Sequence, residues 1–171
     1  LRSPEAVFTF FVFQALKANK QAVELGKNLA YGYEKAYVLR ENIAEIARNS
    51  KNLNVTAQSI TEAYAELTAS TGLVTEHSAD TLETQIMLTK QLGLAAEEAA
   101  GIYKLSVLTE RSSSKINDEM VGAYVAARNQ YKVGVPLRAV LAEAAKVSGQ
   151  LATNLRNNPE LITKAIVQAK A

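Results

Sequence analysis

The sequence predicts an all-α protein, an extended helical bundle or array that starts with a long amino-terminal helix. Apolar residues recur at three- to four-residue intervals, and no segment alternates apolar and polar residues for long enough to form a strand. Alanine occupies 28 of the 171 positions while aromatic residues make up only 6%. Helices can therefore approach closely, but few large side chains are available for a thick core. We expect helix over about 70% or more of the chain, well above the usual share.

The first expected domain, residues 1–50, is one long helix for assembly or contact. Ser3-Pro4-Glu5 supplies an N-cap, a proline at the first helical position and an acidic residue at the positive end of the helix dipole. An apolar stripe then extends from Leu16 to Ala47. Gly26 and Gly32 are the expected places for a kink, because each weakens a helix by about 1 kcal/mol.

The second expected domain, residues 54–171, is an array of shorter helices. Asn54 or Thr56 caps the first of them, which reaches about Ser70 and is ended by Gly72. Later helices are expected at about 75–92, 95–108 and 114–131, from Gly134-Val135-Pro136 to Val147, at about 150–155, and behind Asn158-Pro159-Glu160.

A weak internal repetition accompanies these helices. Leu92-Gly93-Leu94 precedes Glu97-Glu98-Ala99-Ala100, and Gly134-Val135-Pro136 precedes Glu143-Ala144-Ala145. The glycine in each case is expected to stop one helix before the next begins. An ordinary succession of helices, each ended by a glycine, explains this pattern as well as true repeats do. Real units would form an array whose faces need neighbours.

Composition excludes several classes of chemistry. The chain has no Cys, no Trp and one His, so it offers no thiolate nucleophile, cysteine-ligated zinc or disulfide. With 19 basic and 17 acidic residues interspersed, it has no basic surface typical of nucleic-acid binding. No apolar run reaches the roughly 18 residues that span a bilayer. Glycines are scattered singly, and Ser112-Ser113-Ser114 has no nearby base, so it is interpreted as a linker with a cap.

The remaining candidates for chemistry, one histidine and two pairs of acidic residues, are interpreted as residues at the starts of helices. His77 lies between Glu76 and Asp80, but two carboxylates that flank one imidazole are not a metal-ligand set without a further partner, and we expect an exposed helix start. The acidic pairs Glu97-Glu98 and Asp118-Glu119 are expected to be caps near helix amino termini. The sequence therefore nominates no catalytic residue, no metal site and no cofactor.

One group of residues stands out as a candidate contact site. All four phenylalanines, Phe8, Phe10, Phe11 and Phe13, fall within six residues. On a helix they point in most directions, so one partner face cannot cover them all. Two interpretations stay open, namely a core that anchors the bundle and contact with another chain or a membrane.

Several stretches of the carboxyl-terminal half carry a family resemblance. They are Lys90 to Ala100, Lys104-Leu105-Ser106, Ala144 to Ala152, Asn157 to Leu161 and Ala165 to Lys170. Together, over residues 89–171, they resemble the helical region of tail tape-measure-like proteins of tailed bacteriophages and prophages. Ala95 stands where that family often has a serine cap. The resemblance implies a long, alanine-rich helical protein that fills a tail or travels with the genome during ejection.

The expected function is therefore that of a non-enzymatic structural protein of a phage or phage-like particle. As a tape-measure or internal, ejected virion protein, it would pack against other copies or other virion proteins as a homo-oligomer, without specific nucleic-acid binding. Membrane contact during ejection is compatible with this role. The alternative is a cytoplasmic helical scaffold or adaptor that binds partners through grooves between helices. Because the chain begins at Leu1 and ends at Ala171 within an apolar helical period, we expect it to be a segment of a longer protein.

Overall fold

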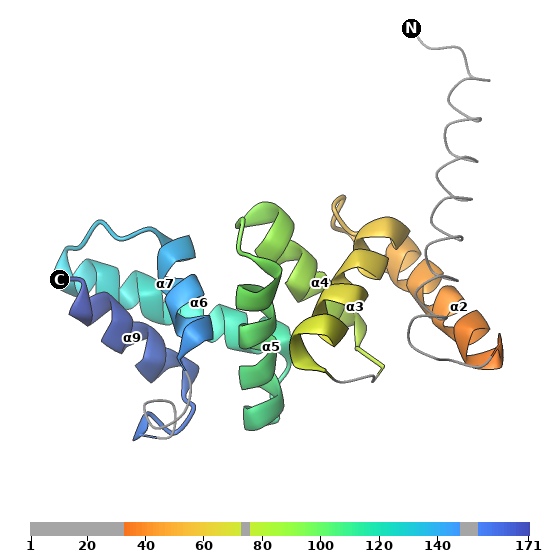
Figure 1. Ribbon diagram of the computed structural model, residues 1–171. Coiled ribbons are helices and arrows are strands. Elements are labelled where there is room, and N and C mark those ends of the chain that lie inside the picture. Colours follow the sequence, from red (N-terminus) through yellow and green to blue (C-terminus); the bar gives the residue numbers. More distant parts are fainter. Residues whose placement is uncertain (1–32, 73–75, 148–153) are drawn as a thin grey trace, which may run out of the picture. The chain divides into compact units, whose positions relative to one another are not determined.

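The computed structural model describes residues 33–72, 76–147 and 154–171 (Figure 1). Helix covers 76% of these residues and they contain no strand, so the predicted all-α class is confirmed. The chain divides into two compact units, residues 1–65 and 66–171. The predictions for the start of the amino-terminal helix, including its N-cap and its glycine kinks, lie outside the described residues.

The first unit contains α2 (Tyr33–Asn49) and most of α3 (Ala57–Thr71). The carboxyl end of α2 coincides with the predicted stop. At the start of α3 the Thr56 backbone N–H donates to Ser59 Oγ at 2.8 Å, and the Ser59 N–H donates to Thr56 Oγ1 at 3.1 Å. This reciprocal pair satisfies two backbone donors and confirms the predicted cap at Thr56. Gly72, with φ of +69°, follows the helix end as predicted.

The second unit contains the remaining elements, which are α4 (Ala79–Ile86), the π-helical turn η1 (Met87–Gln91), α5 (Ala96–Thr109), α6 (Ser113–Tyr131), α7 (Leu137–Lys146) and α9 (Pro159–Ala169). Most of their ends match the predicted ends within two residues. The helix expected at 150–155 falls largely on residues 148–153, outside the described ranges. The helix expected from residue 75 begins instead at Ala79, because Ser78 Oγ accepts the Thr81 N–H at 3.2 Å and so caps it.

The two glycines that were expected to end helices, Gly93 and Gly134, differ in backbone conformation. Gly93 adopts φ of +68° after η1, as expected for a helix stop. Gly134 does not, since α6 ends at Tyr131 and the residue in the left-handed conformation after it is Lys132, with φ of 54°. The two suggested repeat units therefore end their preceding helices differently. Their alanine-rich segments lie in α5 and α7, and these helices pack against each other.

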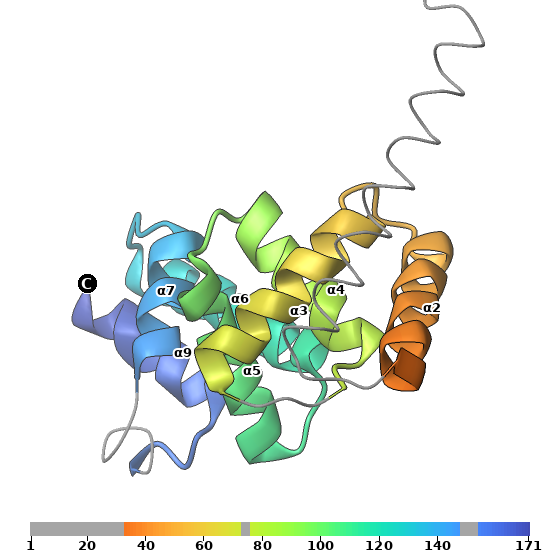
Figure 2. The same ribbon diagram turned by 45° about the vertical axis from the view of Figure 1, so that its right-hand side comes forward.

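Helix α6 is central in the second unit, where it packs against α4, α5, α7 and α9 (Figure 2). Its pairing with α9 is the most extensive. The main core cluster contains Leu88, Leu94, Ala99, Ile102, Leu105, Ile116, Met120, Leu141, Ala144 and Ile162. A smaller cluster of Tyr124, Ala127, Val140 and Val167 extends it. Aliphatic side chains thus supply most of this core, and tyrosine supplies its aromatic part.

Candidate functional site

The phenylalanine cluster, which the sequence nominated for partner contact, lies outside the described residues. Phe8, Phe10, Phe11 and Phe13 therefore stay a prediction, and both interpretations of them stay open. The other residues weighed from the sequence all fall within the second unit, where the structure places each of them.

His77 is not an exposed helix start, so that expectation is wrong. Its side chain is only 8% exposed. The imidazole ring meets the ring of Tyr103 from α5 edge to face, with centroids 5.4 Å apart and an interplanar angle of 87°. Burial lowers the pKa of His77, because desolvation disfavours the charged imidazolium. The residue just before the cap of α4 is therefore a packing residue.

Glu97 and Glu98 lie in the first turn of α5, as predicted. Glu98 Oε2 accepts the Ala95 backbone N–H at 3.0 Å, and Glu98 Oε1 pairs with Lys146 Nζ from α7 at 2.9 Å. The bond to Lys146, followed by the backbone N–H of Ala95, lowers the pKa of Glu98. Ala95 has no side-chain oxygen, so the glutamate alone closes this cap.

The serine run has two separate structural roles. Ser112 Oγ accepts the Lys115 N–H and caps α6, which confirms the predicted cap. Ser113 is buried, and its hydroxyl lies 3.3 Å from Thr81 Oγ1 and 3.2 Å from Ser106 Oγ. These contacts join α4, α5 and α6 at one polar point in their interface.

Asp118 and Glu119 do not cap α6, which begins five residues earlier and has no acidic residue in its first turn. That expectation is wrong because the helix starts at Ser113, so both carboxylates lie beyond the reach of its free N–H groups. Glu119 instead accepts a hydrogen bond from Arg111 Nη1. The two acids contribute to a surface groove between α6 and α9.

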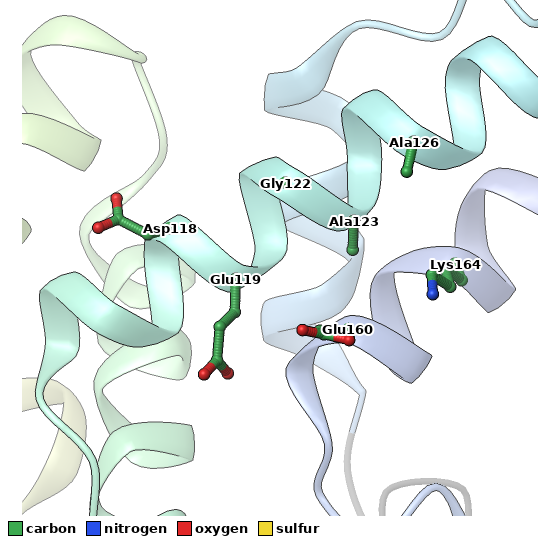
Figure 3. Close-up of a pocket in the computed structure, with 7 residues that line it drawn as sticks. All are labelled: Asp118, Glu119, Gly122, Ala123, Ala126, Glu160 and Lys164. Carbon is green, nitrogen blue, oxygen red and sulfur yellow. The ribbon is translucent and has the colours of Figure 1, made fainter.

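This groove is open to solvent and has a volume of about 470 Å³ (Figure 3). Its lining residues are Asp118, Glu119, Gly122, Ala123 and Ala126 from α6 and Glu160 and Lys164 from α9. Small residues form the α6 wall, and in Figure 3 Ala123 and Ala126 project toward α9. Small side chains allow another helix to approach a backbone closely, so the shape fits a helix better than a compact ligand.

The rim of the groove has an excess of negative charge. Asp118 and Glu160 are exposed and form no ion pair with any other described residue, and the same holds for Lys164. Glu119 is compensated by Arg111. Large apolar side chains are exposed on the same two helices, Val125 at 49% and Leu161 at 45%. The groove therefore combines the small-residue wall of α6 with two carboxylates and one ammonium group that form no ion pair among the described residues.

Sequence reasoning missed Gly122, Ala123, Ala126 and Lys164 as site residues. One signal was present, because a glycine in the middle of a long helix costs about 1 kcal/mol relative to alanine and needs a reason. Pairing of α6 with α9 brings together residues about forty positions apart, and helix periodicity alone does not specify that pairing.

Fold and site define an all-α domain with an inter-helix groove. In the described ranges, no group of three or more His, Cys, Asp or Glu residues is arranged to hold a metal ion. No helix in this part of the chain is long and apolar enough to cross a membrane. Comparisons with protein-family models, curated proteins and solved structures gave no match.

Proposed function

We propose that this chain is a non-enzymatic structural segment of a phage or phage-like particle, of the tape-measure or internal virion class. It would pack through its helices against other copies or other virion proteins, as a homo-oligomer located in the particle. The resemblance over residues 89–171 supports this role. The same residues make up most of the tightly packed second unit.

The observation that carries the proposal is the close crossing of α5 and α7. A Cβ placed on Gly101 would lie 2.5 Å from the Ala145 carbonyl oxygen and 2.9 Å from the Ala145 Cβ. Backbones this close require small residues. Ala145 belongs to one of the stretches that resemble tape-measure-like proteins, and Gly101 directly follows another. Packing of this kind builds extended helical assemblies from a composition poor in large side chains.

The test is the protein composition of purified particles produced by the genome that encodes the chain. Mass spectrometry should find peptides from residues 33–171 in particles that have been banded by density and treated with protease. Major capsid peptides serve as the positive control for the treatment. Recovery of the peptides only from the cellular fraction, with capsid peptides retained in the particle, would make the proposal wrong.

A second candidate is a cytoplasmic helical scaffold or adaptor, and the α6–α9 groove favours it. An adaptor of this kind binds one helix of a partner through a groove between its own helices. Recovery of the peptides only in the cellular fraction would support this candidate. A particle-associated chain would count against it.

A further inference from the structure

Helix α4 has two buried sides of different chemistry. Three of its buried residues are polar, namely Thr81, Thr84 and Gln85. At about 100° per residue these three side chains fall within an arc of about 100° around the helix. The other two buried side chains, Leu82 and Ile86, project outside this arc. Helix α4 therefore buries one polar side and one apolar side.

A chain of hydroxyl groups shows which helices the polar side contacts. The hydroxyl oxygens of Ser78 and Thr81 lie 3.0 Å apart, and Thr81 Oγ1 lies 3.3 Å from Ser113 Oγ of α6. Ser113 Oγ lies in turn 3.2 Å from Ser106 Oγ of α5. Ser106 donates to the Tyr103 carbonyl oxygen at 2.7 Å and so ends the chain. The polar side of α4 thus packs against α5 and α6.

Two further hydrogen bonds join α4 to the same helices. Asp80 Oδ2 accepts the Ser114 backbone N–H of α6 at 3.2 Å, and Gln85 Nε2 donates to the Ala96 carbonyl oxygen of α5 at 3.2 Å. Water can replace hydrogen bonds of this kind, so their net contribution to stability is small. A polar contact between helices therefore separates more easily than an apolar one.

The closed contact also leaves two buried acceptors without a donor. Gln85 Oε1 and Asn117 Oδ1 accept no hydrogen bond from any residue that the structure describes. Asn117 lies one turn after Ser113, on the same side of α6. By contrast, the buried hydroxyl of Thr163 in α9 donates to the Pro159 carbonyl oxygen of its own helix. A buried acceptor without a donor costs free energy, and access of water relieves this cost.

The π-helical turn η1 joins α4 to the main core cluster. Leu88 of η1 is a buried member of that cluster, whose described members include no residue of α4. Within this turn the Leu92 N–H donates to the Met87 carbonyl oxygen, five residues back, at 3.2 Å. Helices bend at such turns because the regular α-helical hydrogen bonds are interrupted there. The turn η1 is thus an anchored point at which α4 can change direction.

We propose that the contact of α4 with α5 and α6 opens and closes as a hinge about η1, while α5, α6, α7 and α9 stay packed. The edge-to-face contact between the His77 and Tyr103 rings separates with it. Opening brings water to the hydroxyl chain without unfolding the apolar core. This inference goes beyond the proposed function, because the motion lies within the second unit and is the same in a particle protein and in an adaptor.

Thiol labelling of the intact chain tests the hinge. Since the chain has no cysteine, one introduced cysteine is its only thiol. Ser113→Cys puts the thiol in the α4 contact, and the control Thr163→Cys puts it on α9, so each variant replaces a buried hydroxyl group. A disulfide reagent such as dithionitrobenzoate reacts only with an exposed thiol. Under native conditions it should modify Ser113→Cys about a hundredfold faster than Thr163→Cys, because local opening is more frequent than opening of the core.

A second label excludes an effect of the helix terminus on thiol reactivity. Ser113 lies in the first turn of α6, where the helix amino terminus lowers the pKa of a thiol. Ser106→Cys lies in the same contact but near the carboxyl end of α5. It should also be modified about a hundredfold faster than Thr163→Cys. Either seam variant carries the test alone if the other does not fold. Equal rates for the seam and control thiols would overturn the proposal.

An apolar version of the contact tests why it opens. Thr81→Val with Ser113→Ala, made in the Ser106→Cys chain, removes two hydroxyl groups with little change in volume. Modification of Ser106→Cys should become about threefold slower or more, because the contact then consists of apolar groups that water does not replace. The same pair of changes in the Thr163→Cys chain should leave the control rate unchanged. An unchanged or faster rate at Ser106→Cys would overturn the proposal, since the hydroxyl chain would then hold the contact closed.

Discussion

Glycine has opposite roles at the α5–α7 crossing and in the α6–α9 groove. At the crossing, Gly101 is covered by the backbone of α7, and Ala99, Ala100 and Ala144 near it are buried. In the groove, Gly122 faces open space between two helices that already pack together. A helical glycine thus has different consequences according to what lies against it. The crossing is completed within the chain, whereas the groove remains available to another helix.

The largest expected effect breaks the crossing. Gly101→Val would place a branched side chain against the Ala145 carbonyl oxygen and should destabilise the protein by about 3 kcal/mol through overpacking. Urea unfolding followed by circular dichroism measures this loss. Gly122→Val is the matched control, since it introduces the same residue into an open position. Equal unfolding midpoints for the two variants would contradict the difference between the sites.

A smaller effect of opposite sign is expected at the groove. Gly122→Ala should stabilise the dilute chain by about 1 kcal/mol, because alanine restricts the unfolded chain and has the higher helix propensity. Thermal melting at low concentration reports this gain. A loss of stability would mean that part of the same chain already fills the groove.

Low pH is expected to reduce the stability of the second unit through His77, which packs against Tyr103 of α5. Burial lowers its pKa from 6.5, so the unfolded chain binds a proton more readily than the folded one. The contribution of His77 to the free energy of unfolding is therefore fully present above the unfolded pKa of 6.5. It decreases as the pH falls from there through the lower pKa of the folded chain, and it is constant at still lower pH. His77→Phe keeps an aromatic ring beside Tyr103 and should flatten this part of the stability profile between pH 7 and 5, as measured by urea unfolding. An unchanged profile would show that His77 is not its source.

The smallest effect concerns the ion pair at the edge of the crossing. Lys146 pairs with Glu98 at 2.9 Å, but the lysine side chain is 68% exposed. Lys146→Met should therefore cost about 0.5 kcal/mol or less, with a smaller difference at high salt. Chemical unfolding at two salt concentrations checks this. A loss above about 2 kcal/mol would mean that the pair, rather than the close backbone approach, holds α5 against α7.

The caps and stops of the helices could be predicted well, whereas the candidate site could be predicted only in part. The sequence predicts a cap at Asn54 or Thr56 and another at Asn158. In the structure Thr56 and Asn158 accept backbone N–H bonds from the helices that follow them. The predicted start of α4, at about residue 75, is too early, because Ser78 caps the helix and Ala79 is its first residue. Glu160 was noticed only as part of a helix start. Its position beside Gly122 depends on how α9 packs against α6.

The all-α class and most of the helix ends can be predicted from the sequence alone. Those features depend on interactions between residues within about four positions, such as side-chain caps and left-handed glycines, and such interactions can be recognised along the chain. The burial of His77, the close contact over Gly101 and the open groove beside Gly122 become visible only in the packed helices. In each case the deciding neighbour comes from a helix distant in sequence, and the surface that a residue meets is set by how whole helices pack.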